Sequence, residues 1–188
     1  MTAPDRRATR HQATRQEILA AAWDLARRDG LGGWSLRDLA TAVGMRAPSL
    51  YVYFDSKNAV YDALFAQGYQ SLLDRVAAVP ADQASLRTAA HLFFDFCVEE
   101  PARHALLFLR TLPGFEPSVD SYRLAQDALQ QLGDLLAESG AADPAAVDLW
   151  TALCTGLATQ QISNDPGGRR WADLVDRAVD MYEATQLG

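Results

Sequence analysis

The stretch that decides the fold is residues 35–57, SLRDLATAVGMRAPSLYVYFDSK. Its pattern predicts a short helix, a turn at Gly44, a second and very short helix, and the start of a third. In the second helix Leu50 and Phe54 are four residues apart, so both can point into a core. Pro48, Ser49, Val52 and Tyr53 would then face outward. Such a face, lying between Arg46 and Lys57, is suited to insertion into the major groove of DNA.

Capping signals support these helix boundaries. Ser35 followed by Asp38 three residues later is a capping box, which marks the start of the first helix. Gly44 occupies the position after that helix, where a left-handed backbone is needed. Pro48 lies in the first turn of the next helix, where its missing N–H costs little. Ser56 can cap a long helix over residues 57–79.

The composition is that of an ordinary globular protein. Of the 188 residues, 49% are hydrophobic and 22% are charged. No apolar run reaches the roughly 18 residues that a transmembrane helix needs, so we expect no membrane contact. No signal-peptide pattern follows the N-terminal arginines, which predicts a cytoplasmic protein. Cys97 and Cys154 lie inside apolar helical patterns and are expected to be buried thiols rather than a disulfide.

The net charge of −7 is unevenly distributed along the chain. Residues 1–58 hold nine Arg and Lys residues against six acidic residues, whereas the remainder holds eight against eighteen. A basic end on an acidic body can be oriented toward phosphates while the body is repelled. Chance sorting of surface charge is the alternative explanation.

The whole chain is helical in pattern, which predicts an all-α fold of about nine helices. We expect residues 1–58 to form an N-terminal arm and a helix-turn-helix domain. The helix over 57–79 would link it to a C-terminal helical domain over residues 59–188. Besides those already described, helices are predicted near residues 14–29, 82–99, 102–111, 118–138, 144–163 and 169–186.

Residues 44–65, GMRAPSLYVYFDSKNAVYDALF, resemble the tetracycline-repressor (TetR) family of bacterial transcriptional regulators. The matching pattern is Leu-Tyr-x-Tyr-Phe at Leu50–Phe54, followed by the Ser-Lys pair that opens a long helix. The resemblance covers residues 14–65 and continues beyond them as a general helical layout. Residues 150–156, WTALCTG, also resemble the Trp-His-Gly type of segment found in one subgroup, with Thr155 in place of the histidine.

The resemblance implies a homodimer in which each helix-turn-helix reads half of a palindromic DNA operator. It also implies that the C-terminal helices enclose a pocket for a small, largely apolar effector. Ligand binding there would change the separation of the two recognition helices, and because dimer symmetry fixes the half-site spacing, it would release a repressor from its operator. The resemblance implies no enzyme activity, catalytic residue, cofactor or metal.

Within this family pattern, two tyrosines and two cations carry the sharpest expectations. We expect Tyr53 to face outward with its hydroxyl on a phosphate, and Tyr51 to pack its ring at the edge of the buried face. Lys57 lies at a helix N-terminus, which also attracts phosphate. Arg46 replaces the usual capping residue at a cost of about 1 kcal/mol, and it can contact guanine or phosphate. The alternatives are half-buried aromatic rings and solvated cations.

The full set of residues expected to contact DNA is Ser35, Arg37, Arg46, Ala47, Pro48, Ser49, Tyr51, Val52, Tyr53 and Lys57. For Ser35 a purely capping role is the alternative. The first dozen residues are expected to be a mobile arm whose Arg6, Arg7 and Arg10 either attract phosphates non-specifically or are merely solvated.

An aromatic-rich set of side chains in the C-terminal half is the candidate ligand pocket, because cavities between bundle helices suit small apolar molecules. Its members are Phe93, Phe94, Phe96, Cys97, Phe108, Phe115, Tyr122, Trp150 and Cys154. Ordinary core packing is the alternative for each. His91, Asp95 and His104 are weak metal-ligand candidates, and a satisfied polar pair is the preferred interpretation.

The last two helices carry apolar stripes that suit self-association, in which two helices per subunit form a bundle at a two-fold axis. The predicted interface consists of Val147, Trp150, Leu157, Gln161, Trp171, Leu174, Val175, Ala178 and Tyr182. The alternative is that these stripes close the core of the subunit itself.

Three other functions compete with the ligand-controlled regulator. A helical-bundle enzyme would need a nucleophile and base, a metal cluster or a phosphate loop, and none is visible in the sequence. A regulator without a ligand would have a fully packed C-terminal body. A protein-interaction module would lack the salt dependence that phosphate contacts impose on DNA binding.

Overall fold

The structure is a computed structural model that describes residues 6–141 and 143–186. Over these residues the chain forms nine α-helices and two short 3-10 helices, and no β-strand, which confirms the expected all-α fold. The α-helices are α1 (Arg6–Asp29), α2 (Leu36–Ala42), α3 (Ala47–Leu50), α4 (Lys57–Ala77), α5 (Leu86–Glu99), α6 (Pro101–Phe108), α7 (Val119–Glu138), α8 (Pro144–Asn164) and α9 (Val175–Gln186). The 3-10 helices are η1 (Ala81–Gln83) and η2 (Ala172–Leu174).

The first three helices pack against one another, and to the hydrophobic core α1 contributes Ile18 and Ala22, α2 contributes Leu39 and α3 contributes Leu50. These side chains are almost inaccessible to solvent, and Phe54, just after α3, joins them. Because α3 is only four residues long, Leu50 is its single buried residue. The other α3 side chains are therefore left on or near the surface.

Local hydrogen bonds fix the start and end of α2 as predicted. The Ser35 hydroxyl accepts a bond from the Asp38 backbone N–H at 3.3 Å, and the Ser35 backbone N–H donates to the Asp38 carboxylate at 2.8 Å. The bonds from Ser35 hold the pKa of Asp38 below its usual value. Gly44 follows α2 with φ of 68°, a backbone conformation that glycine adopts without strain. Arg46 begins α3 without a side-chain cap, also as predicted.

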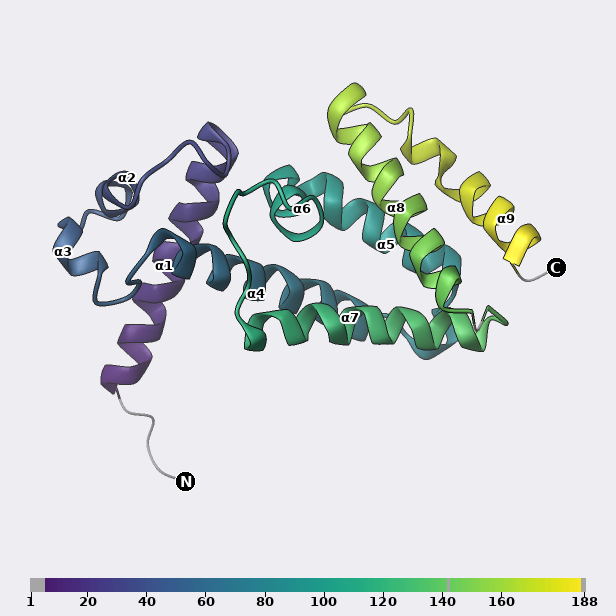
Figure 1. Ribbon diagram of the computed structural model, residues 1–188, viewed down its shortest axis with the longest axis horizontal. Helices are drawn as coiled ribbons and strands as arrows, with labels where there is room; N and C mark the ends of the chain where they lie inside the picture. The colour runs from purple at the N-terminus through teal and green to yellow at the C-terminus, as the bar shows by residue number, and fades with distance from the viewer. Residues whose placement is uncertain (1–5, 142, 187–188) are drawn as a thin grey trace.

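Helix α4 joins the N-terminal helices to the rest of the molecule (Figure 1). Its first turns bury Val60 and Tyr61, and the Tyr61 hydroxyl donates a hydrogen bond to the carbonyl of Leu31 in the loop after α1. Its later turns bury Leu64, Phe65 and other residues among the C-terminal helices. One continuous helix thus contributes to both packing units.

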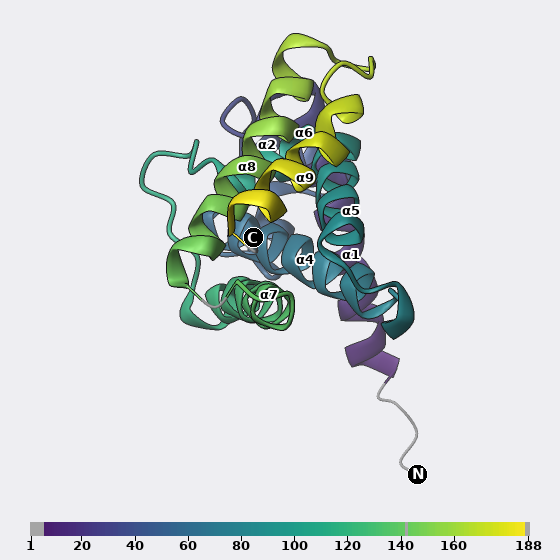
Figure 2. The ribbon, with the colours of Figure 1, turned by 90° about the vertical axis from the view of Figure 1, so that its right-hand side faces the viewer.

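The C-terminal helices build a bundle on α4. Helix α7 runs along α4, while α5 and α6 pack on another side of it. Helix α8 crosses α5, and α9 covers α5 and α8 at the end of the chain (Figure 2). None of the helices among the described residues is both long enough and apolar enough to cross a membrane.

Several boundaries differ from the sequence-based expectation, and α1 differs most. It begins at Arg6 rather than near residue 14, so the expected mobile arm is helical wherever it is described, and residues 1–5 lie outside the described residues. No glycine or proline interrupts residues 6–29 and the segment includes good helix formers, but its apolar stripe starts only at Ile18. Periodicity therefore placed the helix start too late. At the other end, the segment near 169–186 divides into η2 and α9.

Candidate nucleic-acid interface and internal cavity

The α3 segment, defined as residues 46–54, presents a cluster of side chains to solvent, as the sequence predicted. Leu50 and Phe54 are buried, at 1% and 2% exposure, whereas Val52 is 72% and Tyr51 is 54% exposed. Arg46, Pro48 and Ser49 are exposed beside them, and Ala47 is half-buried. An aliphatic side chain and a tyrosine held in solvent directly after so short a helix gain nothing from the protein's own core. This is therefore a surface available for contact.

Tyr53 was expected to face outward and Tyr51 to pack at the edge of the core, but the structure shows the reverse. Tyr53 is half-buried, and its ring stacks on His11 of α1 with centroids 4.7 Å apart. The guanidinium of Arg15 donates to the Tyr53 carbonyl at 2.9 Å and lies 4.1 Å from the centre of the Phe54 ring. The early start of α1 supplies the contact with His11, whereas Arg15 lies within the helix predicted over residues 14–29. Tyr51, expected at the edge of the core, is the more exposed of the two.

Lys57, in the first turn of α4, is half-buried rather than free in solvent. Its ammonium donates to the carbonyl of Gly32 at 3.2 Å and lies 4.5 Å from the ring centre of Trp34. Burial lowers the pKa of Lys57. The cation is thereby held in one place at the N-terminus of α4, where the free backbone N–H groups also favour an anion.

The remaining predicted contacts lie at the starts of α2 and α3. Arg37 and Arg46 are exposed and form no ion pair within the described part of the chain. The Ser35 hydroxyl is occupied by Asp38, to which it also donates at 2.6 Å. Capping is therefore an observed role of Ser35, and a contact with DNA stays a prediction for it and for the other nine residues.

A cavity of about 880 Å³ lies in the C-terminal bundle, lined by α4, α5, α6, α7, α8 and the loop that follows α6, and open to solvent on one side at exposed residues such as Tyr122 and Leu129. Several predicted pocket residues line it, namely Phe93, Phe108, Phe115, Tyr122, Trp150 and Cys154. Phe65 and Tyr69 of α4 and several leucines of α6 and α7 complete the apolar wall. Sequence reasoning missed the α4 residues because that helix was treated as a linker. The C-terminal body is thus not fully packed.

Three predicted pocket residues are not part of the cavity wall. Phe94, Phe96 and Cys97 are buried in the core around α5, and the Arg103 guanidinium covers the Phe96 ring at 3.7 Å. Phe94 is rotated by about 100° from Phe93 and so points elsewhere. Phe96 and Cys97 are on nearly the same side of α5 as Phe93 but lie about one turn further along the helix, past the residues that line the cavity. The sequence pattern could not tell which aromatic face of α5 would meet open space.

The polar groups of the cavity lie mostly at its edge. Arg110, Glu116 and Asp148 line it and are exposed, whereas Thr151 and Thr155 of α8 are half-buried. Burial raises the pKa of the Cys154 thiol to about 12, so this cysteine is a neutral wall residue rather than a nucleophile. An apolar interior with a few polar groups is the usual character of a small-molecule site.

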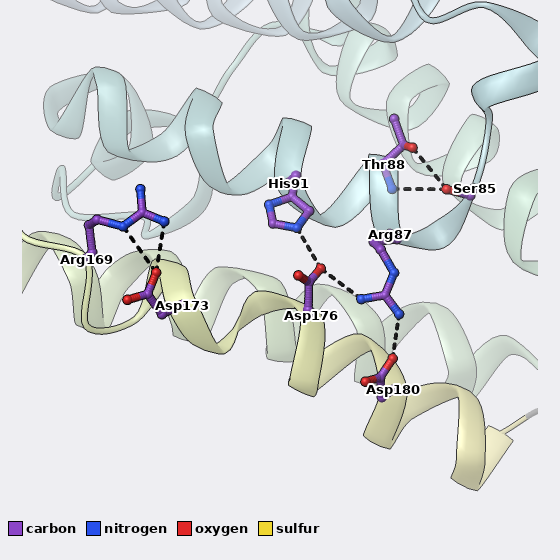
Figure 3. A network of polar contacts seen from close by, with 8 residues as sticks. All are labelled: Ser85, Arg87, Thr88, His91, Arg169, Asp173, Asp176 and Asp180. Carbon is purple, nitrogen blue, oxygen red and sulfur yellow. Dashed lines mark hydrogen bonds and ion pairs between the residues drawn. The ribbon is translucent and has the colours of Figure 1, made fainter.

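The histidines considered as metal ligands have separate protein partners. His91 is 2.8 Å from the Asp176 carboxylate, which Arg87 also contacts at 2.8 Å, so α5 and α9 are joined by a surface cluster (Figure 3). His104 is buried, and its Nε2 lies 3.0 Å from the Thr159 hydroxyl. No group of three possible metal ligands occurs among the residues that could be searched.

Aromatic contacts connect the cavity to the N-terminal helices. Phe115 lines the cavity, and its ring meets the Tyr61 ring edge-on at a centroid distance of 5.6 Å. Tyr61 in turn packs edge-on against Trp34 at 5.5 Å and bonds to Leu31, both in the segment between α1 and α2. An ion pair between Arg27 and Glu100 also joins the end of α1 to the start of α6.

The predicted self-association stripe on α8 and α9 is largely turned inward. Trp150 and Tyr182 meet edge-on at 4.9 Å, and the Tyr182 hydroxyl donates to the Ala146 carbonyl at 2.8 Å. The Gln161 side chain accepts bonds from two backbone N–H groups of the following loop. The buried members, which cannot meet a partner in this conformation, are Trp150, Gln161, Val175, Ala178 and Tyr182. The half-buried members are Val147, Leu157, Trp171 and Leu174.

A different face of these two helices is open. Leu149 is 50% exposed on α8, with exposed Ala152 and Gly156 on the same side, and Met181 is 62% exposed on α9. A methyl group added at Gly156 would meet no atom within 4 Å. The burial of the larger side chains agrees with the alternative that this stripe closes the subunit's own core, and the position of a dimer interface stays a prediction.

Comparisons with known proteins agree with the site at the N-terminus. Residues 18–64 match the model of the family described as bacterial regulatory proteins, tetR family. The HTH-type transcriptional regulator Rv1816 of Mycobacterium tuberculosis is 29% identical over 174 residues, covering 85% of this chain and 70% of that protein. The regulator YobS of Bacillus subtilis is 28% identical over 100 residues, so the match spans about half of each protein, 52% in both cases.

Solved structures extend the similarity to the whole fold. The regulatory protein SCO4313 superposes with a TM-score of 0.82 at 22% identity, covering 97% of this chain and all of that one. FadR from Bacillus subtilis, solved in complex with stearoyl-CoA, has a TM-score of 0.66 at 16% identity and covers 89% of this chain and 96% of that one. With the helix-turn-helix motif and the all-α architecture, these findings support a TetR-family transcriptional regulator, with the family match itself covering residues 18–64.

Proposed function

We propose that this chain is a homodimeric repressor that binds a palindromic operator through α3 and leaves it when a small, largely apolar ligand enters the cavity. In this proposal residues 1–58 contact DNA, and residues 59–188 bind the ligand and the second subunit. The observation that carries the proposal is the α3 segment, where Tyr51 and Val52 are held in solvent beside Arg46. As a transcriptional regulator, the protein would act in the cytoplasm, where bacterial DNA lies.

DNA contact at α3 follows from the chemistry of the exposed face. Val52 and Ala47 can approach thymine methyl groups, and Ser49 can reach a base edge or a phosphate. Arg46 can contact guanine or phosphate at the groove edge. Tyr51 and the fixed ammonium of Lys57 would hold the backbone, which positions α3 without reading sequence.

The cavity supports an apolar effector. Its volume of about 880 Å³ lies within the usual range for ligand sites, and aromatic and aliphatic side chains dominate its wall. The stearoyl-CoA complex of FadR gives an example of a ligand carried by a protein of this fold. A molecule with an apolar body and one polar end fits the interior and the polar edge at Thr151 and Asp148.

Ligand binding can reach the DNA-binding end through Phe115 and Tyr61. A ligand that displaces the Phe115 ring would shift Tyr61 and, with it, the bond from Tyr61 to the Leu31 carbonyl. The Phe115 and Tyr61 rings would have two arrangements, one with and one without the displacement. A ligand shifts the equilibrium between these arrangements only if it binds one of them more tightly than the other. Because two α3 segments must match two half-sites, a small rotation of each would remove much of the operator affinity.

The exposed stripe of α8 and α9 is the proposed dimer face. Ala152 and Gly156 allow close approach of two helices, and Leu149 and Met181 supply apolar contact around them. Packing of both helices against their symmetry mates would give a four-helix bundle at a two-fold axis. We therefore move the interface from the buried stripe to this outer one.

The direct test is selection of genomic DNA fragments with the purified protein, followed by footprinting. We expect a recurring inverted repeat, protected symmetrically. Tyr51→Ala should weaken binding while leaving the dimer intact, and Arg123→Ala on α7 is the matched control that should change nothing. Selected fragments without a shared inverted repeat, or a Tyr51→Ala variant that binds normally at matched salt, would contradict the proposal.

A further inference from the structure

The first turns of α1 extend past the α3 segment and away from the rest of the molecule (Figures 1 and 2). Residues 7–13 are exposed along their whole length, and burial begins only at Thr14 and Arg15. This segment makes α1 longer than packing against the other N-terminal helices requires. Packing within the protein therefore does not explain which side chains this part of the helix carries.

One side of α1 is apolar where it packs on the core and polar where the helix extends beyond the core. In the C-terminal part of the helix this side carries Ile18, Ala22 and Leu25, which are buried in the core. The same helical spacing continued toward the N-terminus gives Thr14, His11 and Arg7. The core-facing side of the helix thus becomes polar and cationic beyond the core.

Contacts at Tyr53 fix the direction of this extension. His11 stacks on the Tyr53 ring at 4.7 Å with an interplanar angle of 26°. One turn later, Arg15 bonds to the Tyr53 carbonyl and covers the Phe54 ring. The extension is therefore held against the end of the α3 segment, and its surface is continuous with the one that faces DNA in the proposed function.

The charge of the extension is of one sign. Residues 6–16 contain four arginines and one histidine and no acidic residue. Arg10 forms no ion pair within the residues that the structure describes. His11 and Arg15 hold this part of the helix to the protein through Tyr53 and Phe54. The phosphate backbone of DNA is the partner that complements such a surface next to a groove-binding helix.

We propose that residues 7–15 of α1 are a second DNA-contacting element, which lies on the sugar–phosphate backbone beside the groove occupied by α3. This inference rests on the proposed function, since it adds contacts to the same operator complex. Arg7 and Arg10 neutralise phosphates, and His11 is a positioning residue that keeps the helix against Tyr53 by stacking. The element adds affinity and footprint length but reads no bases, because its contacts are with the backbone.

The test is the salt dependence of binding to a duplex that carries the selected inverted repeat. The double variant Arg7→Ala/Arg10→Ala should lower the slope of log affinity against log salt by roughly 0.9 for each phosphate that the variant no longer neutralises. The ratio of wild-type affinity to the affinity of the double variant should accordingly fall by about tenfold between about 50 and 200 mM salt. The control Arg123→Ala removes an exposed arginine from α7 and should keep the wild-type slope.

Hydroxyl-radical footprinting gives the second readout. The double variant should lose protection of backbone positions that flank each half-site while keeping protection at its centre. His11→Ala should shorten the footprint in the same way, whereas His11→Phe, which preserves stacking without the imidazole, should restore it. A histidine that acts by charge would show no rescue, and this result would overturn its positioning role.

The outcomes separate this inference from the proposed function. Wild-type binding to an inverted repeat, with an unchanged salt slope and footprint in the double variant, would overturn only the role of the α1 extension. Absence of any specific duplex for the wild-type protein would overturn both.

Discussion

The α3 segment and the α8–α9 pair were both identified from the positions of apolar and aromatic side chains, yet only the first faces outward as predicted. At the end of α3, Leu50 points into the core, and Tyr51 and Val52, which directly follow the helix, remain in solvent. In α8 and α9, the stripe containing Trp150 and Tyr182 is buried inside the subunit. A second, plainer stripe with Leu149 and Met181 is the exposed one.

The difference arises from helix length and from what surrounds each helix. A helix of four residues has room for one inward residue, so the remaining positions face outward almost by exclusion. A helix of twenty-one residues such as α8 touches α5, α7 and α9 on different sides. An apolar stripe then indicates burial, but it does not indicate whether the covering surface belongs to the same subunit or to another.

Trp150→Ala gives the largest expected effect. Truncation of a buried tryptophan should lower the free energy of unfolding by about 3 kcal/mol or more, and the loss should persist at every protein concentration. Denaturant unfolding at two protein concentrations measures it. If Trp150 were an interface residue instead, the variant would chiefly shift the dimer toward monomer, and the comparison of the two stripes would be wrong.

Leu149→Arg tests the opposite stripe. Two arginines close to a two-fold axis repel each other and lose solvation, which should weaken the dimer by about a hundredfold. The folded subunit should be almost unaffected, because Leu149 is half exposed. Light scattering over a dilution series reports the mass, with Val119→Arg on α7 as the control. A monomeric wild-type protein at micromolar concentration would remove the basis of this prediction.

Tyr51→Phe tests the exposed member of the tyrosine pair. Loss of one hydrogen bond to a phosphate should cost about 1.5–3 kcal/mol of operator affinity, or roughly tenfold or more. The free energy of unfolding should change by less than about 0.5 kcal/mol, since the side chain is exposed. Fluorescence anisotropy and urea unfolding supply the two values, with Tyr122→Phe on the body as the control. Equal affinities of Tyr51→Phe and wild type would assign the phosphate contact to another residue.

His104→Gln gives the smallest expected effect. It replaces a polar side chain that is buried in the subunit. Burial lowers the pKa of His104 below the ordinary value of 6.5, so the folded state holds the neutral ring. Above that ordinary value, protonation of His104 makes no difference to folding. As pH falls below it, the unfolded chain binds more protons and the folded state loses stability. Urea unfolding between pH 7.5 and 5 should therefore show a flatter profile for His104→Gln, and identical profiles would refute the buried neutral state.

Much of the helix layout could be predicted because capping and turn residues act locally. Ser35 with Asp38, Gly44, and Ser56 before Lys57 define their helix ends through bonds within a few residues. The start of α1 could not be predicted in this way, because no cap or apolar stripe marks Arg6. As a result the contact of Tyr53 with His11, across 42 positions, was missed. The bond from Arg15 was missed because it joins residues 38 positions apart, although Arg15 lies in the predicted helix.

The cavity shows the same limit. Aromatic side chains of α5 to α8 were recognised as a set, and several of them form its wall. Whether Phe93 or Phe94 faces open space depends on the rotation of α5 against α4 and α8, a property that single-sequence periodicity does not contain. Phe65 and Tyr69 entered the wall because α4 continues from the N-terminal helices into the bundle.

Local chemistry alone was sufficient to specify the all-α architecture, the helix-turn-helix and the outward face of α3, since each depends on side chains within a few residues of one another. The three-dimensional packing had to decide which tyrosine is exposed, which aromatic rings enclose the cavity and which stripe of α8 and α9 is free. These features depend on contacts between distant parts of the chain, where the partner of an apolar or cationic surface is set by how whole helices lie against one another.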